Sequence, residues 1–350
     1  MKTFNNLYTK LCSRENLEKA FKMARKGKTK KSYVINFEKN LDEELNKLQE
    51  ELIDETYTPK KLQRFIVRDP KTRVIHASSF RDRIVYHALI NVIGPIFEKR
   101  FIYDSYASRI NKGTHKALIR FDVFKRKTSH NGKLIKNARN ANEVCGYILK
   151  CDIRHYFETI DHSILLSMLE RKISDKKVIF LIKKILMNYD SKVPGKGMPL
   201  GNYTSQFFAN VYLNELDYFI KHALKVKCYM RYVDDFIIFH YEKRTLFFYL
   251  ENIKRFLGKL KIELHQEKTK IIPLRNGVPF VGYRIFYMHK LLRKRNLKLF
   301  VSRIRQRKEQ FQQGKMPKEE FMQSIKGWLG YAQWANTYGQ RKKILKEITS

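Results

Sequence analysis

The sequence has few acidic residues for its length. Asp and Glu number 34 against 72 Lys and Arg, which leaves a formal net charge of +38 at pH 7. This deficit of negative charge predicts a polyanionic partner, above all nucleic acid. A basic protein that binds a membrane surface is the competing interpretation of the same charge.

Cysteine is scarce as well, and its spacing excludes a common class of metal site. The four cysteines, Cys12, Cys145, Cys151 and Cys228, form no Cys-x-x-Cys pair, and the ten histidines are scattered. Because zinc sites need closely spaced ligands, the sequence predicts no zinc centre. Reduced and mostly buried thiols are expected instead.

Long apolar runs, internal repeats and low-complexity segments are missing too. No apolar stretch approaches the ~18 residues that span a bilayer, and the N-terminus lacks the apolar core of a secretory signal. We therefore expect no membrane partner and a cytoplasmic location. With 350 residues, 43% of them hydrophobic, the chain can bury a large core in one elaborate domain or in two to three subdomains.

Two adjacent aspartates, Asp234 and Asp235, stand between the apolar stretches 228–233 and 236–239. Strand-like composition on both sides predicts a hairpin with the two carboxylates at or near its tip. Adjacent carboxylates repel each other, and a divalent cation relieves that repulsion. In a basic chain this favours magnesium and a phosphate substrate. Taken alone, such a pair is more often a polar surface turn.

A third carboxylate, Asp152, lies near the end of an apolar strand predicted for residues 147–153. An aspartate there is costly unless it binds a cation or lies at the exposed end of a sheet. An N-cap for the following helix is the alternative. Together with the adjacent pair it completes a site for two metal ions, which would activate a primer 3′-hydroxyl and hold a triphosphate.

The remaining pattern is typical of an α+β protein with an all-helical C-terminal part. Helices are predicted at 41–52, 83–97, 164–169, 178–187 and 245–261, with a longer one after Gly201. Strands are predicted at 65–67, 74–77, 270–273 and 279–287. Residues 125–143 are polar and basic, which predicts a surface loop or insertion. From Leu292 onward the pattern is helical and very basic, so a domain boundary is placed near 288–292.

Five segments carry a family pattern in a fixed order. They read Phe-Arg-Asp-Arg-Ile-Val at 80–85, Asp-Ile-Arg-His-Tyr-Phe at 152–157, Tyr-Val-Asp-Asp at 232–235, Glu-Lys-Thr-Lys at 267–270 and Phe-Val-Gly-Tyr at 280–283. Each is weak alone, but the ordered set resembles reverse transcriptases of the bacterial, group II intron-like kind. The resemblance implies a right-hand polymerase, an α+β fold whose palm contains an antiparallel sheet. It implies an N-terminal segment and fingers over 1–145, a palm over 146–290 and a helical thumb over 291–350.

The same resemblance implies roles for individual residues. Asp152, Asp234 and Asp235 become the catalytic metal ligands, with Ile153 beside them. They bind two Mg²⁺ ions, for which Mn²⁺ can substitute. Further residues are implied in binding the dNTP, namely Arg68, Lys71, Arg73, Phe157, Leu200, Gly201, Gln206 and Lys268. Others are implied in binding nucleic acid, namely Tyr232, Gly282, Arg293, Lys294, Arg295, Arg303 and Arg305.

Two of the dNTP-binding assignments also have a direct physical argument. A triphosphate needs cations beyond the metals, and Arg73 can grip it in a bidentate way, with Arg68 or Lys71 as its basic partner. Solvated turn charges are the alternative. Phe157 matches the family's gate, because a bulky apolar ring clashes with a ribose 2′-hydroxyl and so favours dNTP over NTP. A core aromatic is the alternative for Phe157.

One loop departs from the common family pattern. Most reverse transcriptases have Gln-Gly-x-x-x-Ser-Pro there, whereas this chain has Leu200 before Gly201 and Gln206 after Ser205. This wording resembles the reverse transcriptases of diversity-generating retroelements, which copy a template-repeat RNA into cDNA with errors at adenines. A missing polar contact at the dNTP is a physical reason for loose selection. The resemblance implies a small, basic, pentameric accessory variability protein as a partner.

Three other functions stay open. The nearest is another prokaryotic reverse transcriptase, of group II intron, retron or phage-defence type, which the loop wording disfavours. The next is a non-catalytic RNA-binding protein, which the three intact carboxylates disfavour. Phe157 and the order of the motifs disfavour an RNA-dependent RNA polymerase.

Overall fold

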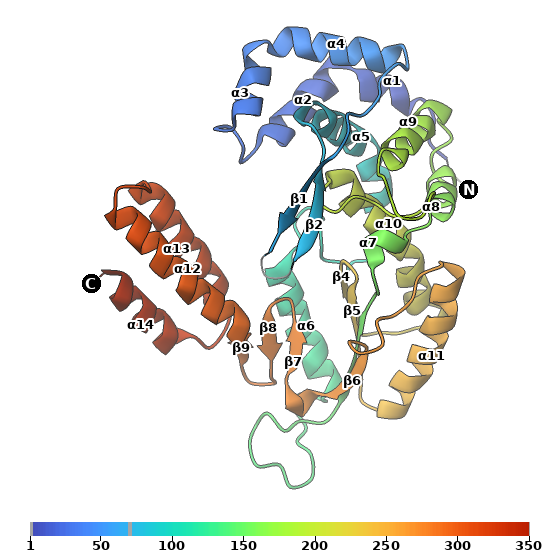
Figure 1. Ribbon diagram of the computed structural model, residues 1–350. Coiled ribbons are helices and arrows are strands. Elements are labelled where there is room, and N and C mark those ends of the chain that lie inside the picture. The colour runs from blue at the N-terminus through green and yellow to red at the C-terminus, as the bar shows by residue number, and fades with distance from the viewer. Residues whose placement is uncertain (1–2, 69–71, 350) are drawn as a thin grey trace.

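A four-stranded antiparallel sheet lies at the centre of the molecule, with its strands in the order β4-β5-β3-β6 (Figure 1). The computed structural model describes residues 3–68 and 72–349, without the side chain of Thr349. The strands of this sheet are β3 (Tyr147–Asp152), β4 (Tyr229–Tyr232), β5 (Asp235–His240) and β6 (Lys270–Pro273). The predicted hairpin around the aspartate pair and the strand that ends at Asp152 are confirmed.

Both faces of this sheet are covered by the rest of the chain. Leu149 and Ile238 pack into a core that they share with Tyr212 of α10 (Tyr203–Tyr218), whereas Ile148 and Ile237 pack into a second core. The alternation follows from the two-residue period of a strand. Because both faces are buried, residues 148–149 of β3 and 236–239 of β5 are consecutive buried apolar residues rather than alternating ones.

Helices from the middle of the chain pack against the sheet or against other helices. They are α6 (Thr114–Thr128), α7 (Tyr156–Thr159), α8 (His162–Glu170), α9 (Lys176–Met187), α10 (Tyr203–Tyr218) with a π-helical extension at Phe219–Ala223, and α11 (Lys243–Lys259). The helices predicted near 164–169, 178–187 and 245–261 are confirmed as α8, α9 and α11. The longer helix predicted after Gly201 is α10.

The N-terminal part is a group of helices packed on α5. They are α1 (Leu7–Cys12), α2 (Arg14–Arg25), α3 (Ser32–Lys39), α4 (Leu41–Ile53) and α5 (Phe80–Glu98). The helix predicted from leucines at helical spacing is confirmed as α4, in which Leu45, Leu48 and Leu52 are buried. The start of α5 at Phe80 is set by Ser79, whose hydroxyl accepts a hydrogen bond from the Asp82 N–H at 3.2 Å.

A two-stranded ribbon projects from this helical group toward the sheet (Figure 1). It consists of β1 (Gln63–Val67) and β2 (Arg73–Ala77), paired antiparallel, and confirms both predicted strands. Its apolar side chains Phe65 and Ile66 are exposed. Lys71 lies outside the described residues, between the two strands.

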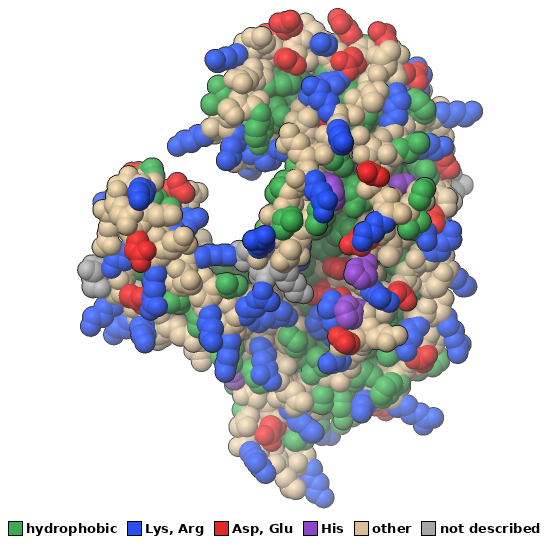
Figure 2. Space-filling model, viewed as in Figure 1, with side chains coloured by type: hydrophobic (Ala, Val, Ile, Leu, Met, Phe, Trp, Pro, Cys, Tyr) green, Lys and Arg blue, Asp and Glu red, His purple; other side chains and the backbone are tan. Residues whose placement is uncertain are grey.

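The C-terminal part begins with a small antiparallel sheet and continues as three helices. The sheet contains β7 (Val278–Phe280), β8 (Tyr283–Ile285) and β9 (Lys290–Leu292), and follows a short 3₁₀ turn at Leu274–Asn276. The helices are α12 (Lys294–Gln312), α13 (Lys318–Ala332) and α14 (Tyr338–Thr349). Figure 2 shows Lys and Arg side chains bordering the open space between these helices and the rest of the molecule.

Two predictions need correction. Residues 125–143 are not all loop, because α6 continues through Thr128 and buries Lys125. The Lys125 ammonium donates to Asp122 Oδ1 at 2.8 Å and to the carbonyls of Phe286 at 3.0 Å and Tyr287 at 2.6 Å, so a carboxylate and two backbone carbonyls replace its solvent contacts. The single strand predicted at 279–287 is a hairpin of β7 and β8, because Val281 and Gly282 take positive φ and reverse the chain.

The thiols and the lengths of the helices bear on the expectations for cysteine and for a membrane span. All four cysteines are free thiols, and Cys12 and Cys151 are buried while Cys145 and Cys228 are half-buried. Within residues 3–68 and 72–349, no helix combines the length and the apolar character that a membrane crossing requires.

Candidate active site

The three predicted metal ligands lie at one end of the two inner strands of the central sheet, β3 and β5. Asp152 ends β3 and lies directly opposite Asp235, the first residue of β5. Asp234 occupies the turn that joins β4 to β5, beside Val233. Side chains of directly opposed residues share one face of a sheet, so register rather than sequence proximity brings Asp152 to the pair.

The electrostatics of Asp234 reflect this crowding. Burial raises its pKa to about 6, and the charges of Asp152 and Asp235 act in the same direction. A backbone hydrogen bond and the Lys268 ammonium lower it in part. Without a bound cation, the site therefore holds a proton more tightly than an exposed aspartate does.

Two lysines neutralise the other carboxylates. Lys268 Nζ lies 2.9 Å from Asp152 Oδ1, and the Lys150 ammonium bonds to Asp235 Oδ1. Lys268 was expected to bind dNTP, whereas Lys150 was not predicted. Lys150 lies two residues before Asp152 on the same strand face, so the period of two could have identified it.

The donor set fits a divalent cation, although the side chains do not converge on one. Three carboxylates supply the oxygen ligands that Mg²⁺ prefers. Across residues 3–68 and 72–349, no three His, Cys, Asp or Glu side chains are arranged around one point as metal ligands would be. Asp152 and Asp235 each form an ion pair with a lysine instead. Ile153 has a buried apolar side chain, which leaves only its backbone carbonyl as a ligand.

A cavity of about 770 Å³ opens over Asp234 and Asp235. Five other predicted residues line it, namely Arg73, Phe157, Leu200, Gln206 and Tyr232. The sequence did not reveal several more, including His76, Ser108, His155, Tyr189 and Asn210. These come from separate segments of the chain, and no single spacing pattern links them.

The backbone around Phe157 sets its position in this cavity. His155, the residue directly before α7, has a φ of 46°. The carbonyl of Phe157 accepts a hydrogen bond from the Met198 N–H at 2.7 Å. The backbone of Phe157 is therefore held by the loop that leads to Leu200.

That loop is attached to the β1–β2 ribbon. The carbonyl of Leu200 accepts a hydrogen bond from the His76 N–H at 3.1 Å. Gly201 has a φ of 116°, and a Cβ there would lie 2.8 Å from Ile75 Cγ2, so glycine is required. At the far end, Gln206 Oε1 accepts a hydrogen bond from Ser108 Oγ at 3.0 Å. Ribbon and loop thus form one wall of the cavity.

The basic side chains that were predicted to bind the triphosphate differ in their placement. Arg73 is exposed at the start of β2 and lines the cavity. Arg68 is exposed at the end of β1 but does not line the cavity. Lys71 falls outside the described residues.

The predicted nucleic-acid residues extend from the cavity to α12. Tyr232 lines the cavity, and its hydroxyl lies 3.1 Å from Thr114 Oγ1. Gly282 has a φ of 94° and follows Val281, another lining residue. The five basic candidates, Arg293, Lys294, Arg295, Arg303 and Arg305, are all exposed on or beside α12. Arg305 forms an ion pair with Glu347 of α14.

Comparison with known proteins gives one family match and several relatives. A family model described as reverse transcriptase (RNA-dependent DNA polymerase) matches residues 59–285, more than half of the chain. Protein YkfC of Escherichia coli (strain K12) is 26% identical over 295 residues, which cover 72% of this chain and 72% of YkfC. Group II intron-encoded protein LtrA of Lactococcus lactis subsp. cremoris is 26% identical over 315 residues. That match covers 70% of this chain but only 50% of LtrA.

Solved structures support the fold. Apo telomerase from Candida tropicalis superposes with a TM-score of 0.51 at 15% identity, covering 71% of this chain and 52% of that chain. At such low identity the likeness concerns the fold alone. It agrees with the α+β, right-hand polymerase architecture expected from the sequence.

Proposed function

The chain belongs to the reverse transcriptase (RNA-dependent DNA polymerase) family, and on that premise we propose that it copies the template-repeat RNA of a diversity-generating retroelement into adenine-mutagenised cDNA. Family membership supports the general activity, RNA-directed DNA polymerisation on an RNA template. One observation supports the finer assignment. Leu200 and Gln206, the two residues that depart from the common pattern, both line the cavity over Asp234 and Asp235.

The proposed mechanism assigns the carboxylates to metal binding. Reverse transcriptases need divalent metal ions, and Asp152, Asp234 and Asp235 would hold two Mg²⁺ ions, which Mn²⁺ could replace. When bound, the ions supply Lewis-acid activation of the primer hydroxyl and charge neutralisation at the triphosphate. Lys150 and Lys268 are within bonding distance of the carboxylates and would turn toward phosphate as the cations bind.

The protein's own residues select and orient the nucleotide. Arg73 would pair with the triphosphate as the incoming anion enters the cavity. Phe157 would exclude the ribose 2′-hydroxyl, because a ring offers that hydroxyl neither space nor a hydrogen bond. Leu200 would contact the base or sugar without a hydrogen bond, so a correct pair gains less over a mispair.

The proposed partners follow from the same assignment. The family binds template RNA and cDNA, and the net charge of +38 supports a polyanionic partner. We further propose template-repeat RNA as the specific template, dNTPs as substrates and a pentameric accessory variability protein as a protein partner.

A second candidate is a reverse transcriptase of the group II intron type. The similarity to group II intron-encoded protein LtrA over 70% of this chain favours it. The chain spans half the length of LtrA, so the whole activity of that relative is a proposal for this chain.

Primer extension on a defined RNA tests both candidates. Purified protein is incubated with a primed RNA, dNTPs and Mg²⁺, and the cDNA is sequenced. Extension with errors concentrated opposite adenine supports the diversity-generating assignment, whereas extension with errors spread evenly over the four bases supports the second candidate. No extension by the wild-type chain, with Mg²⁺ or Mn²⁺, would overturn both.

A further inference from the structure

Arg231 is a fully buried arginine directly before the catalytic turn. It is 0% exposed and is the third residue of β4, with Tyr232 and Val233 between it and Asp234. A guanidinium removed from water is costly unless its donors all find partners. The proposed mechanism gives this residue no direct role, yet its contacts lead to the reacting site.

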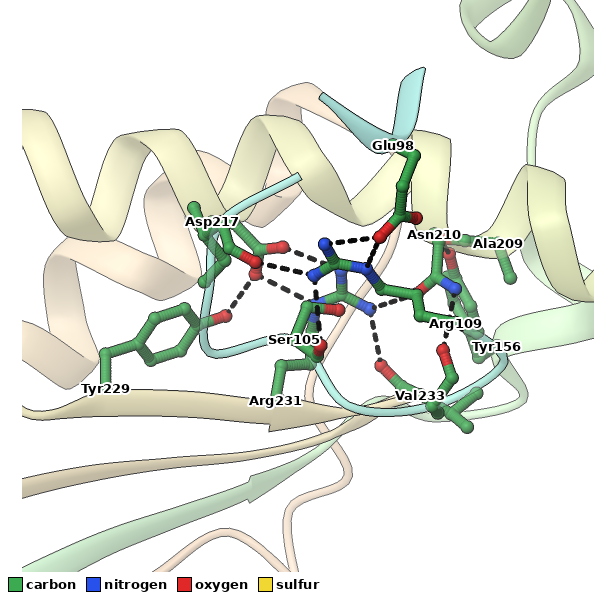
Figure 3. Close-up of polar contacts among 12 residues, drawn as sticks. Glu98, Ser105, Arg109, Tyr156, Ala209, Asn210, Asp217, Tyr229, Arg231 and Val233 are labelled. Carbon is green, nitrogen blue, oxygen red and sulfur yellow. Dashed lines mark hydrogen bonds and ion pairs between the residues drawn. The ribbon is translucent and has the colours of Figure 1, made fainter. Parts of the chain in front are cut away.

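One side of the guanidinium is fixed to α10. Asp217, also 0% exposed, accepts from Arg231 Nε at 2.8 Å and from Nη2 at 2.6 Å, and the Tyr229 hydroxyl donates to the same carboxylate at 2.6 Å (Figure 3). Bidentate contacts of this kind hold an arginine in one orientation. The Asp217 carboxylate and its helix therefore act as the fixed support.

The other side reaches the turn itself. Arg231 Nη1 donates to the Val233 carbonyl at 3.0 Å and to Asn210 Oδ1 at 3.0 Å (Figure 3). Val233 has a φ of 57°, a conformation that a β-branched residue rarely adopts. Such a conformation persists when surrounding contacts hold it, and the Nη1 bond is one such contact.

Asn210 connects the same guanidinium to the cavity wall. Its Nδ2 donates to the Ala107 carbonyl at 3.0 Å, and both residues line the cavity. The backbone of Arg231 also pairs with the segment before Ala107, through Asp104 O at 2.9 Å and Tyr106 N at 2.9 Å. The turn, α10 and the 104–107 segment thus meet at one side chain.

We propose that Arg231 is a positioning residue for polymerisation, which ties the Val233–Asp234 turn to α10 and so holds Asp234 and Asp235 in place for the metal ions. The inference rests on the proposed polymerase function. Arg231 touches no substrate and acts through the turn, so its loss lowers turnover and metal binding rather than dNTP or RNA affinity.

Arg231→Lys is the informative variant. Lysine keeps the buried positive charge against Asp217, but a single nitrogen cannot also reach Val233 and Asn210. We expect kcat for single-nucleotide addition to fall at least about tenfold, with KM for dNTP and Kd for RNA within about threefold of wild type. Mn²⁺ binding, measured from the EPR signal of free Mn²⁺, is expected to weaken several-fold.

Arg109 provides a matched control. Its side chain is 6% exposed and pairs with Glu98, and Nη1 donates to the carbonyls of Ile102 at 2.6 Å and Ser105 at 3.0 Å (Figure 3). Arg109 therefore supports the segment next to Arg231, but none of these contacts is made to Val233 or Asp234. Arg109→Lys removes a similar set of hydrogen bonds. We expect a comparable decrease in Tm but a kcat within about threefold of wild type.

A second variant covers the case in which Arg231→Lys fails to fold. The double substitution Arg231→Met with Asp217→Leu removes both buried charges, which proteins often tolerate, and it still lacks the donor to Val233. A loss of kcat in this protein supports the proposal. The proposal is overturned if a folded Arg231 variant keeps wild-type kcat and Mn²⁺ binding, or if both arginine variants lose kcat equally at equal decrease in Tm. An inactive wild-type chain would instead refute the proposed function, and the Mn²⁺ comparison would still decide the role of Arg231.

Discussion

Asp152 and Asp235 form the last register pair between β3 and β5, so two carboxylates that are far apart in the sequence lie opposite each other at the end of these strands. Like charges directly opposite each other destabilise a sheet. Here Lys268 and Lys150 offset them, one at each carboxylate. Asp234 has the least relief and a raised pKa. This unequal neutralisation leads to the first two predictions.

Asp234→Asn should abolish cDNA synthesis, because it removes a charged metal ligand. The protein should still fold, because the substitution also removes one of three carboxylates that repel one another. Primer extension and circular dichroism are measured on the same preparation. Glu158→Gln is a suitable control, since Glu158 lines the same cavity but its carboxylate faces His155 rather than the aspartates. Extension by Asp234→Asn at near the wild-type rate would contradict the active-site assignment.

The stability of the metal-free protein should depend on pH through Asp234. Its pKa rises from 3.8 to about 6 on folding, so the folded state binds this proton more tightly than the unfolded chain does. This contribution to stability is present below about pH 4 and is lost as pH rises through about 6. In EDTA at pH 8, the free energy of unfolding of Asp234→Asn should therefore exceed that of wild type by on the order of 2–3 kcal/mol. Urea unfolding measures the difference, which should vanish near pH 4. An advantage that is equal at both pH values would exclude Asp234 titration as its cause.

Phe157→Val should admit ribonucleotides. The smaller side chain leaves space for a 2′-hydroxyl in the cavity that Phe157 lines. Single-nucleotide extension is measured with dNTP and NTP in parallel, and the ratio of kcat/KM values should fall. Phe157→Tyr, which keeps the ring, is the control. A ratio that does not change in Phe157→Val would remove this residue from the gate.

Leu200→Gln should lower misincorporation opposite adenine more than opposite other bases. An amide beside the nucleotide supplies a hydrogen bond worth about 1 kcal/mol, which is several-fold in selectivity. cDNA copied from one RNA by both proteins is sequenced. Leu200→Met keeps an apolar side chain of similar volume and should leave the errors as they are. Equal adenine error rates in the Leu200→Gln and wild-type libraries would mean that Leu200 does not determine fidelity.

Neutralising the exposed basic run at the start of α12 should flatten the salt dependence of RNA binding. The variant replaces Arg293, Lys294, Arg295 and Lys298 with Gln, all of them exposed. For each phosphate that the variant no longer neutralises, the slope of log K against log salt should become shallower by about 0.7–0.9. The control replaces four exposed lysines in or beside the N-terminal helices, Lys19, Lys22, Lys26 and Lys39. If both variants have the same slope, the α12 run makes no particular contribution.

Local pattern in the sequence predicted most of the elements. Leucines at helical spacing predicted α4, and apolar runs on each side of Asp234 predicted the β4–β5 hairpin. These predictions succeed because side-chain periodicity records which face of an element is buried. The loop predicted at 125–143 was wrong for 125–128, where the last turn of α6 is polar because Lys125 bonds to Asp122 and to backbone carbonyls.

At the candidate site, the types of residue could be predicted from the sequence, whereas several of their contacts could not. The order of residues along the chain was enough to predict the chemical types: three carboxylates, a basic turn, an aromatic at 157 and a loop with Leu200 in place of an amide. The strand period places Lys150 on the face of Asp152, but the fold was needed to show that Lys150 bonds to Asp235, that Gly201 packs against Ile75 and that Arg231 joins Asp217 to the Val233 carbonyl. Such contacts depend on strand register and on helix packing across many residues, and these are set by burial of the whole core rather than by any local spacing.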